Sequence, residues 1–257
     1  MPVLFLGHGS PMNGIEENEF VTGFRNQARE LDKPNAVIVV SAHWETRGTY
    51  VTAMQNPRTI HDFGGFPREL YEVQYPAPGH PELAKEIAQT VQPTWSVHLD
   101  DQWGLDHGSW TVVKHLFPAA DVPVIQLSLD YGLSPLEHYE LAKQLSKLRD
   151  KGVLIVGSGN MVHNLRQVAF DKINEHFGYD WAVEAHEKMN QWVLEGNHEA
   201  LINFRKQGRA FDLSIPTAEH FLPLLYVLGL KVEEEDVKLF NDQTIAGSIS
   251  MTSVKVG

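Results

Sequence analysis

Cysteine is absent from this chain, and so are basic clusters and long apolar runs. Without cysteine there is no disulfide and no thiolate metal site, so a bound metal must use histidine, carboxylate, carbonyl or water ligands. The formal net charge of -12 argues against nucleic acid or an anionic membrane surface as a partner. No apolar stretch approaches the roughly 20 residues that a membrane helix needs. The first residues do not resemble a signal peptide, so we expect a cytoplasmic protein.

Histidine, in contrast, is abundant, at 13 of the 257 residues. Three apolar runs lead into a histidine: residues 3–7 into His8, residues 36–42 into His43, and residues 153–156, through a glycine-rich turn, into His163. Continuous apolar runs of this kind predict strands that are buried on both faces of a parallel sheet. Ligands of such sheets bind at the carboxyl ends of the strands. The sequence therefore predicts a metal site or an acid/base site at that edge.

The alternation of these runs with helical patterns predicts a single α/β domain over residues 1–257. Its centre is expected to be a mainly parallel or mixed sheet flanked by helices. Helices are expected over residues 17–31, 81–91, 106–116, 135–150, 181–204 (broken near Gly196) and 218–228. Further strands are expected over 97–99, 122–129, 237–240 and 248–256, and the last two alternate apolar and polar residues, which suits antiparallel or edge strands. Thr217 is the expected N-cap of the last helix, and Gly229 its end. The aromatic segment 45–79 is predicted to be an ordered loop that forms one wall of a pocket.

Other polar residues stand where helices are expected to begin. His220 is predicted in a first helical turn, which favours a neutral, metal-binding imidazole, although an exposed residue gives the same pattern. Its neighbour Glu219 is a candidate carboxylate ligand. His107 can orient a substrate or carry protons, whereas Asp106 before it fits a simple helix cap. The remaining histidines are interpreted as ordinary surface or partly buried residues: His80, His98, His115, His138, His176, His186 and His198.

Each of these motifs also has an alternative explanation. His8 fits a tight turn and His43 a core histidine, but the ends of adjacent strands lie close enough for both imidazoles to bind one ion. The turn of residues 157–160 can cradle a phosphate, although no complete phosphate-binding fingerprint is present. The pair His61 and Asp62 is a weaker candidate site. Neither the serine hydrolase motif G-x-S-x-G nor the zinc peptidase motif H-E-x-x-H occurs.

Seven motifs occur together in the order of a known family: GHGSPM at 7–12, SAHW at 41–44, IHDFGGFP at 60–67, YPAPG at 75–79, DHGSW at 106–110, SGNMVHN at 158–164 and EHFLPL at 219–224. From about residue 2 to its C-terminus the chain resembles the DOPA 4,5-dioxygenase family of class III extradiol ring-cleavage dioxygenases, in the LigB-like superfamily. The resemblance implies an enzyme that opens a catechol such as DOPA with dioxygen, using a non-haem Fe(II) centre on an α/β fold.

The resemblance also implies roles for five histidines. His8, His43 and His220 correspond to metal ligands, His163 to an acid/base residue close enough to act as a fourth ligand, and His107 to a residue that supports the site or contacts substrate. More distant extradiol dioxygenases use two histidines and a carboxylate, whereas here a histidine stands at the third position. An all-histidine site also suits Zn(II). A zinc-dependent hydrolase and a non-catalytic metal- or catechol-binding protein therefore stay open as alternatives.

Overall fold

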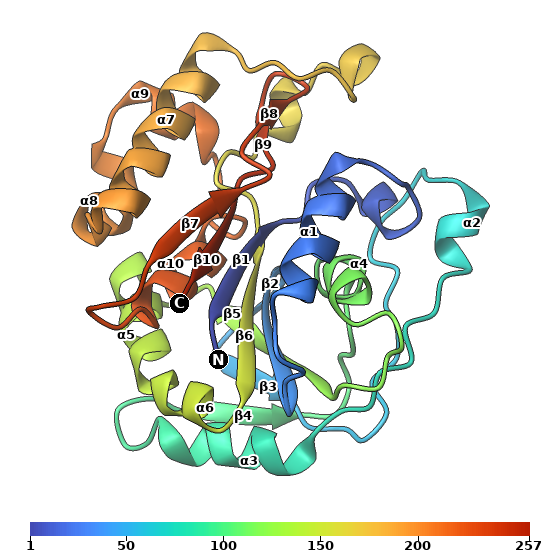
Figure 1. The fold of residues 1–257 in the computed structure, drawn as a ribbon. Helices are drawn as coiled ribbons and strands as arrows, with labels where there is room; N and C mark the ends of the chain where they lie inside the picture. The colour runs from blue at the N-terminus through green and yellow to red at the C-terminus, as the bar shows by residue number, and fades with distance from the viewer.

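Eight strands form one mixed sheet at the centre of the molecule, in a computed structural model that describes residues 1–257 (Figure 1). Their order across the sheet is β4-β3-β5-β2-β6-β1-β10-β7. The strands are β1 (Val3–Gly7), β2 (Ala36–Thr46), β3 (Thr49–Thr52), β4 (Val97–Asp100), β5 (Val124–Asp130), β6 (Val153–Gly159), β7 (Val237–Phe240) and β10 (Ser253–Val256). Two short strands, β8 (Thr244–Ile245) and β9 (Ile249–Ser250), form a separate pair. The predicted α/β domain with a mixed sheet is confirmed.

The centre of the sheet is parallel and buried on both faces. Strands β5, β2, β6 and β1 run parallel, so their carboxyl ends share one edge. Alternate side chains enter different apolar clusters: Phe5 and Ile38 belong to one cluster, Leu4 and Val37 to the other. Because both faces of these strands are buried, their sequences are continuous apolar runs. In one detail the expectation was wrong, because β6 separates β1 from β2, whose histidines were expected at the ends of adjacent strands.

Helices cover both faces of this sheet. The helices are α1 (Glu19–Arg29), α2 (Arg68–Tyr71), α3 (Pro81–Thr90), α4 (His107–Leu116), α5 (Pro135–Gln144), α6 (Ser146–Asp150), α7 (Asp180–Glu195), α8 (His198–Ile202), α9 (Arg209–Ser214) and α10 (Leu222–Gly229), with 3-10 turns η1 (Pro11–Gly14), η2 (Leu165–Gln167), η3 (Phe170–Lys172) and η4 (Phe204–Lys206). Apolar residues of α1 and α4 join the cluster on one face, and those of α3, α5, α7 and α10 the cluster on the other. The helix predicted over 135–150 is divided at Leu145 into α5 and α6.

The start of α10 differs from the prediction. Thr217 does not cap this helix, because its hydroxyl donates to Glu219 at 2.8 Å and the helix begins only at Leu222. Pro223 explains the late start: proline has no N–H to give to a preceding turn, so it suits only the first positions of a helix. His220 consequently lies in the turn before the helix, with its backbone facing the end of β6.

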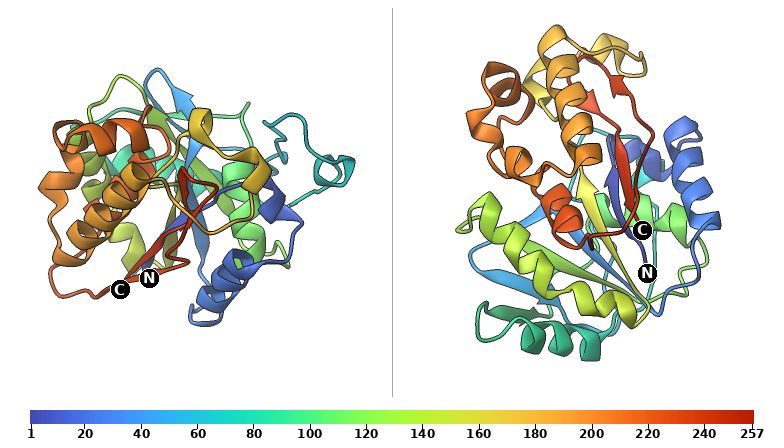
Figure 2. Two further views of the ribbon diagram at one scale, coloured as in Figure 1. Left: turned by 90° about the horizontal axis from the view of Figure 1, so that it is seen from above. Right: turned by 60° about the vertical axis from the view of Figure 1, so that its left-hand side comes forward.

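The two ends of the chain meet in the same sheet. Val3 of β1 lies opposite Val256 of β10, and Figures 1 and 2 show the termini side by side. The antiparallel strands β10 and β7 extend the sheet beyond β1, as the alternating pattern of the C-terminal residues predicted. The strand expected over 248–256 is, however, divided into β9 and β10, which belong to different sheets. None of the helices combines the length and the apolar character that crossing a membrane requires.

Candidate metal centre

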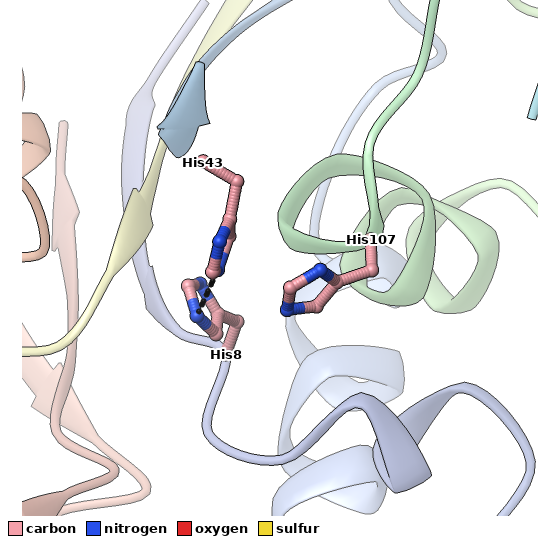
Figure 3. A group of neighbouring side chains, drawn as sticks. All are labelled: His8, His43 and His107. Carbon is pink, nitrogen blue, oxygen red and sulfur yellow. Dashed lines mark hydrogen bonds between the residues drawn. The ribbon is translucent and has the colours of Figure 1, made fainter. Parts of the chain in front are cut away.

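Five histidines from five separate elements meet at the carboxyl edge of the sheet. His8 follows β1, His43 lies in β2, His107 opens α4, His163 follows β6, and His220 precedes α10. All five line one cavity of about 810 Å³. Figure 3 shows the imidazoles of His8 and His43 in contact, with that of His107 turned toward them. The structure therefore brings together every histidine that the sequence analysis placed in the site.

Three of these rings have the spacing of ligands around one ion. The ring centroids of His8, His43 and His220 are 5.0, 5.3 and 5.0 Å apart in pairs. Three imidazoles bound to one tetrahedral ion through bonds of about 2.1 Å would place their centroids about 5.2 Å apart. The Nε2 atoms of His8 and His43 lie 3.2 Å from each other, against about 3.4 Å for two such ligands. The centroid spacing of the three rings is therefore that expected of three ligands to one ion.

His107 is closer to His43 than a fellow ligand would be. Nitrogen atoms of His8, His43 and His107 lie within 4.8 Å of one another, and those of His163 and His220 form a second group with a Glu219 oxygen. However, the ring of His107 is 3.8 Å from that of His43 and 5.9 Å from that of His8. This uneven spacing favours His220 over His107 as the third ligand.

Hydrogen bonds fix the tautomer of His8. The hydroxyl of Ser158 donates its only hydrogen to the carbonyl oxygen of Gly108 at 2.5 Å, and lies 3.0 Å from Nδ1 of His8. Ser158 must therefore accept the Nδ1 proton of His8, which leaves the lone pair of Nε2 for a metal. A similar contact orients His220, whose Nδ1 lies 3.0 Å from the carboxylate of Glu219. Metal-binding histidines are typically held through their second nitrogen in this way.

Four of the five site histidines, His8, His43, His163 and His220, are neutral near pH 7. Burial, reinforced by the neighbouring imidazoles, lowers the pKa of His8 and His220 well below the ordinary histidine value. Burial lowers the pKa of His43 as well, and that of His163 to about 4. Only a neutral imidazole has a free lone pair, so this environment keeps the nitrogens ready for a metal ion.

An acidic residue, Asp62, holds His107. One carboxylate oxygen accepts the backbone N–H of His107 at 2.8 Å, and the other lies 3.0 Å from Nδ1 of the ring. Burial raises the pKa of Asp62, but the contacts with His107 outweigh it and hold the pKa below its usual value. The sequence had indicated His61 and Asp62 as a weak pair. Asp62 lines the cavity, whereas the ring of His61 is bonded to the carbonyl of Val73.

The other residues near the site have structural roles. Asp106 caps α4 by accepting the N–H of Ser109 at 3.0 Å, as the cap interpretation predicted. The glycines before His163 are explained by close packing rather than by a phosphate. A Cβ atom on Gly159 would lie 2.1 Å from the carbonyl oxygen of His220, so only glycine allows this approach.

His163 stacks on His220 rather than converging with it. Their ring centroids are 3.5 Å apart and their planes differ by 9°. The lone pair of a ring nitrogen lies in the plane of its ring, so two nearly parallel rings at this separation do not both aim a lone pair at one ion beside them. This arrangement favours a role for His163 beside the ion rather than bound to it.

For two histidines outside the site the sequence-based interpretation was wrong. His138 is fully buried, with Nδ1 3.1 Å from the hydroxyl of Tyr226. His115 is also buried, and its Nε2 lies 2.6 Å from the carbonyl oxygen of Asn13. Both were expected to be surface or partly buried residues, because their polar helical contexts gave no sign of the elements that cover them.

Comparison with known proteins agrees with this site. A family model described as the catalytic LigB subunit of aromatic ring-opening dioxygenase matches residues 2–253, so the chain belongs to this family. The chain is 45% identical over 261 residues to a 4,5-DOPA dioxygenase extradiol of Escherichia coli strain K12, with 100% of this chain and 95% of the relative covered. It is 35% identical to the protein of that name from Beta vulgaris, with coverage of 98% and 94%.

A solved structure has the same fold over its whole length. The crystal structure of an uncharacterized protein from Escherichia coli K12 matches with a TM-score of 0.85 and 40% identity, and both chains are covered completely. Together, the family, the relatives and the histidine cluster establish an extradiol ring-cleavage dioxygenase that depends on a metal, as the resemblance of the motifs implied. They do not favour the hydrolase or the non-catalytic binding protein.

Proposed function

We propose that this enzyme opens the ring of a catechol at an Fe(II) ion held by His8, His43 and His220. The observation that carries the proposal is the convergence of three neutral imidazoles, with ring centroids 5.0 to 5.3 Å apart, at the inner end of a cavity. Neutral nitrogen ligands suit both Fe(II) and Zn(II), so zinc can occupy the same residues. When bound, Fe(II) supplies the redox chemistry that dioxygen needs and increases the acidity of a bound catechol hydroxyl.

His163 is the proposed acid/base residue. It lines the cavity beside His220. Its backbone N–H donates to the carbonyl of Ser214 at 2.9 Å, which holds the backbone from which the imidazole projects. A neutral imidazole at this place can take the proton that the second catechol hydroxyl loses and later return it to the opened product.

His107 and Asp62 are proposed to orient the substrate. With Asp62 beside Nδ1, the Nε2 atom of His107 faces the rings of His8 and His43, as Figure 3 shows. That nitrogen can accept a hydrogen bond from a catechol hydroxyl. The ring of Phe63 lies 5.5 Å from that of His107 and, with Phe66, provides an apolar wall for the catechol ring. These aromatic side chains also exclude water from the reacting carbons.

DOPA is the first catechol to test, because the relatives from Escherichia coli and Beta vulgaris carry its name. Cleavage beside the diol would give a muconic semialdehyde, whose amine can then cyclise with the new carbonyl to a yellow product.

The test is oxygen uptake by protein that has been stripped of metal and reloaded anaerobically with Fe(II) or Zn(II). Uptake and a yellow product are expected with iron and DOPA, and neither with zinc. Confirmed iron loading without oxygen uptake on any catechol would contradict the proposal.

A further inference from the structure

The cavity is much larger than a catechol ring. Its volume of about 810 Å³ lies toward the upper end of the roughly 300–1,000 Å³ found for pockets that enclose drug-sized ligands. The five histidines occupy its inner end, so most of the volume is available to whatever substituent the catechol carries. The outer part of the cavity therefore decides which catechols enter.

Apolar side chains line much of that outer part. They come from the start of α1, from the segment with η2 and η3 (gold in Figure 1), and from β9: Phe20, Leu165, Val168, Phe170, Ile173 and Ile249. Phe170 is 72% exposed and Leu165 is 58% exposed, although both are large and apolar. Exposed apolar surface at the mouth of a pocket marks a place where a ligand covers it. A substituent with an apolar stem fits this part of the cavity.

The lining is also acidic and has no fixed cation. None of its 26 residues is lysine or arginine. Three of its four carboxylates are matched by a neighbour, namely Glu17 by Arg25 at 2.5 Å, Glu19 by His176 at 2.8 Å, and Asp62 by His107 at 3.0 Å. The fourth, Glu16, is half-buried between η1 and α1 and has no such partner. A carboxylate on a substrate would have no lysine or arginine to pair with in this lining, whereas an ammonium group could pair with the carboxylate of Glu16.

We propose that the pocket selects catechols whose side chain ends in a cationic amine, that it discriminates against side chains bearing a carboxylate, and that Glu16 is the residue that receives the amine. This inference rests on the proposed ring cleavage, because the catechol end is taken to lie at the histidines. DOPA carries both groups and should therefore rank between an amine and an acid.

The test compares four catechols of similar size: dopamine, DOPA, neutral 4-ethylcatechol and anionic 3,4-dihydroxyphenylpropionate. With Fe(II)-loaded enzyme, kcat/KM from oxygen uptake should fall in the order dopamine, DOPA, dihydroxyphenylpropionate. Anaerobic calorimetric titration of the redox-inert Zn(II)-loaded protein should give the same order of affinities. The advantage of dopamine over the acid should be about tenfold or more, as expected for a partly desolvated charge pair.

Glu16→Gln is the diagnostic variant, and Glu17→Gln is its matched control. Both remove one negative charge from the same loop, but Glu17 is 71% exposed and already paired with Arg25. The ratio of kcat/KM for dopamine to kcat/KM for 4-ethylcatechol should fall about threefold to fivefold in Glu16→Gln and change less than twofold in Glu17→Gln. Measuring a ratio removes any common effect of the substitution on folding or metal loading.

The possible failures can be told apart. If the acid is bound and cleaved as well as dopamine, the selection is wrong. If both variants change the ratio equally, net charge and not Glu16 is responsible. If the Fe(II)-loaded enzyme consumes no oxygen with 4-ethylcatechol or any other catechol, the proposed reaction is wrong. The order of affinities from calorimetry then still decides whether the pocket prefers the amine.

Discussion

Two groups of buried or partly buried histidines can be compared in this protein. His8, His43 and His220 lie in the cavity, whereas His115 and His138 lie in the helical layers. Burial lowers the pKa of every one of them. The pKa of His138 falls to about 4, the same value as that of His163 in the site. Neither burial nor a lowered pKa therefore identifies the residues that do chemistry here.

The difference lies in where the ring nitrogens point. His115 and His138 each direct a nitrogen to a protein oxygen, and each stands alone. In the cavity, Ser158 and Glu219 engage the Nδ1 atoms of His8 and His220, which leaves the Nε2 atoms for a common ligand. Convergence of free lone pairs, rather than burial, defines the site.

Removing a converging imidazole should have the largest effect. In His43→Ala the ion would lose one of its three proposed protein ligands, so we expect loss of bound metal and a fall in kcat/KM of at least about a thousandfold. Metal analysis and oxygen uptake measure both effects. Retention of a full equivalent of iron would show that His43 is not a ligand.

His163→Ala should separate chemistry from metal binding. If His163 only transfers protons, the variant keeps its metal while turnover falls roughly a hundredfold to ten-thousandfold. The measurement pairs metal content with single-turnover rates. A variant that loses its metal would instead make His163 a fourth ligand.

Asp62→Asn should have a smaller effect, because Asp62 contacts His107 and is proposed to act through it. Loss of the carboxylate beside Nδ1 should lower kcat/KM by roughly tenfold to a hundredfold without metal loss. Asp121→Asn is the control, since Asp121 pairs with Lys33 on the surface. If Asp62→Asn and Asp121→Asn had equal activities, Asp62 would not orient His107 for catalysis.

His138 should influence stability and not catalysis. Its pKa is about 4 in the folded protein, against an ordinary value of 6.5. As the pH falls through this window the unfolded chain binds the proton first, so the free energy of unfolding should decrease by about 2 kcal/mol between pH 7 and pH 5. His138→Gln should lose this part of the pH dependence in denaturant titrations. An unchanged pH slope would contradict the burial argument.

The sequence predicted the site histidines that lie in a strand or directly after one. His8 and His43 were found because apolar runs of β1 and β2 end beside them, and the edge of a parallel sheet is a defined place. The proposed orienting role of Asp62 and the hydrogen bond from His8 to Ser158 were not predicted, because they depend on how a loop and β6 fold against α4. His220 precedes its helix instead of lying in the first turn, because Pro223 holds the start of α10 at Leu222.

The most direct test of convergence compares the metal content of His220→Ala and His107→Ala, both reloaded with Fe(II) under the same anaerobic conditions. The two rings face the same cavity, but only His220 has ligand spacing to both His8 and His43. We predict that His220→Ala loses the metal and that His107→Ala retains about one equivalent. Metal retained in His220→Ala and lost in His107→Ala would contradict the account.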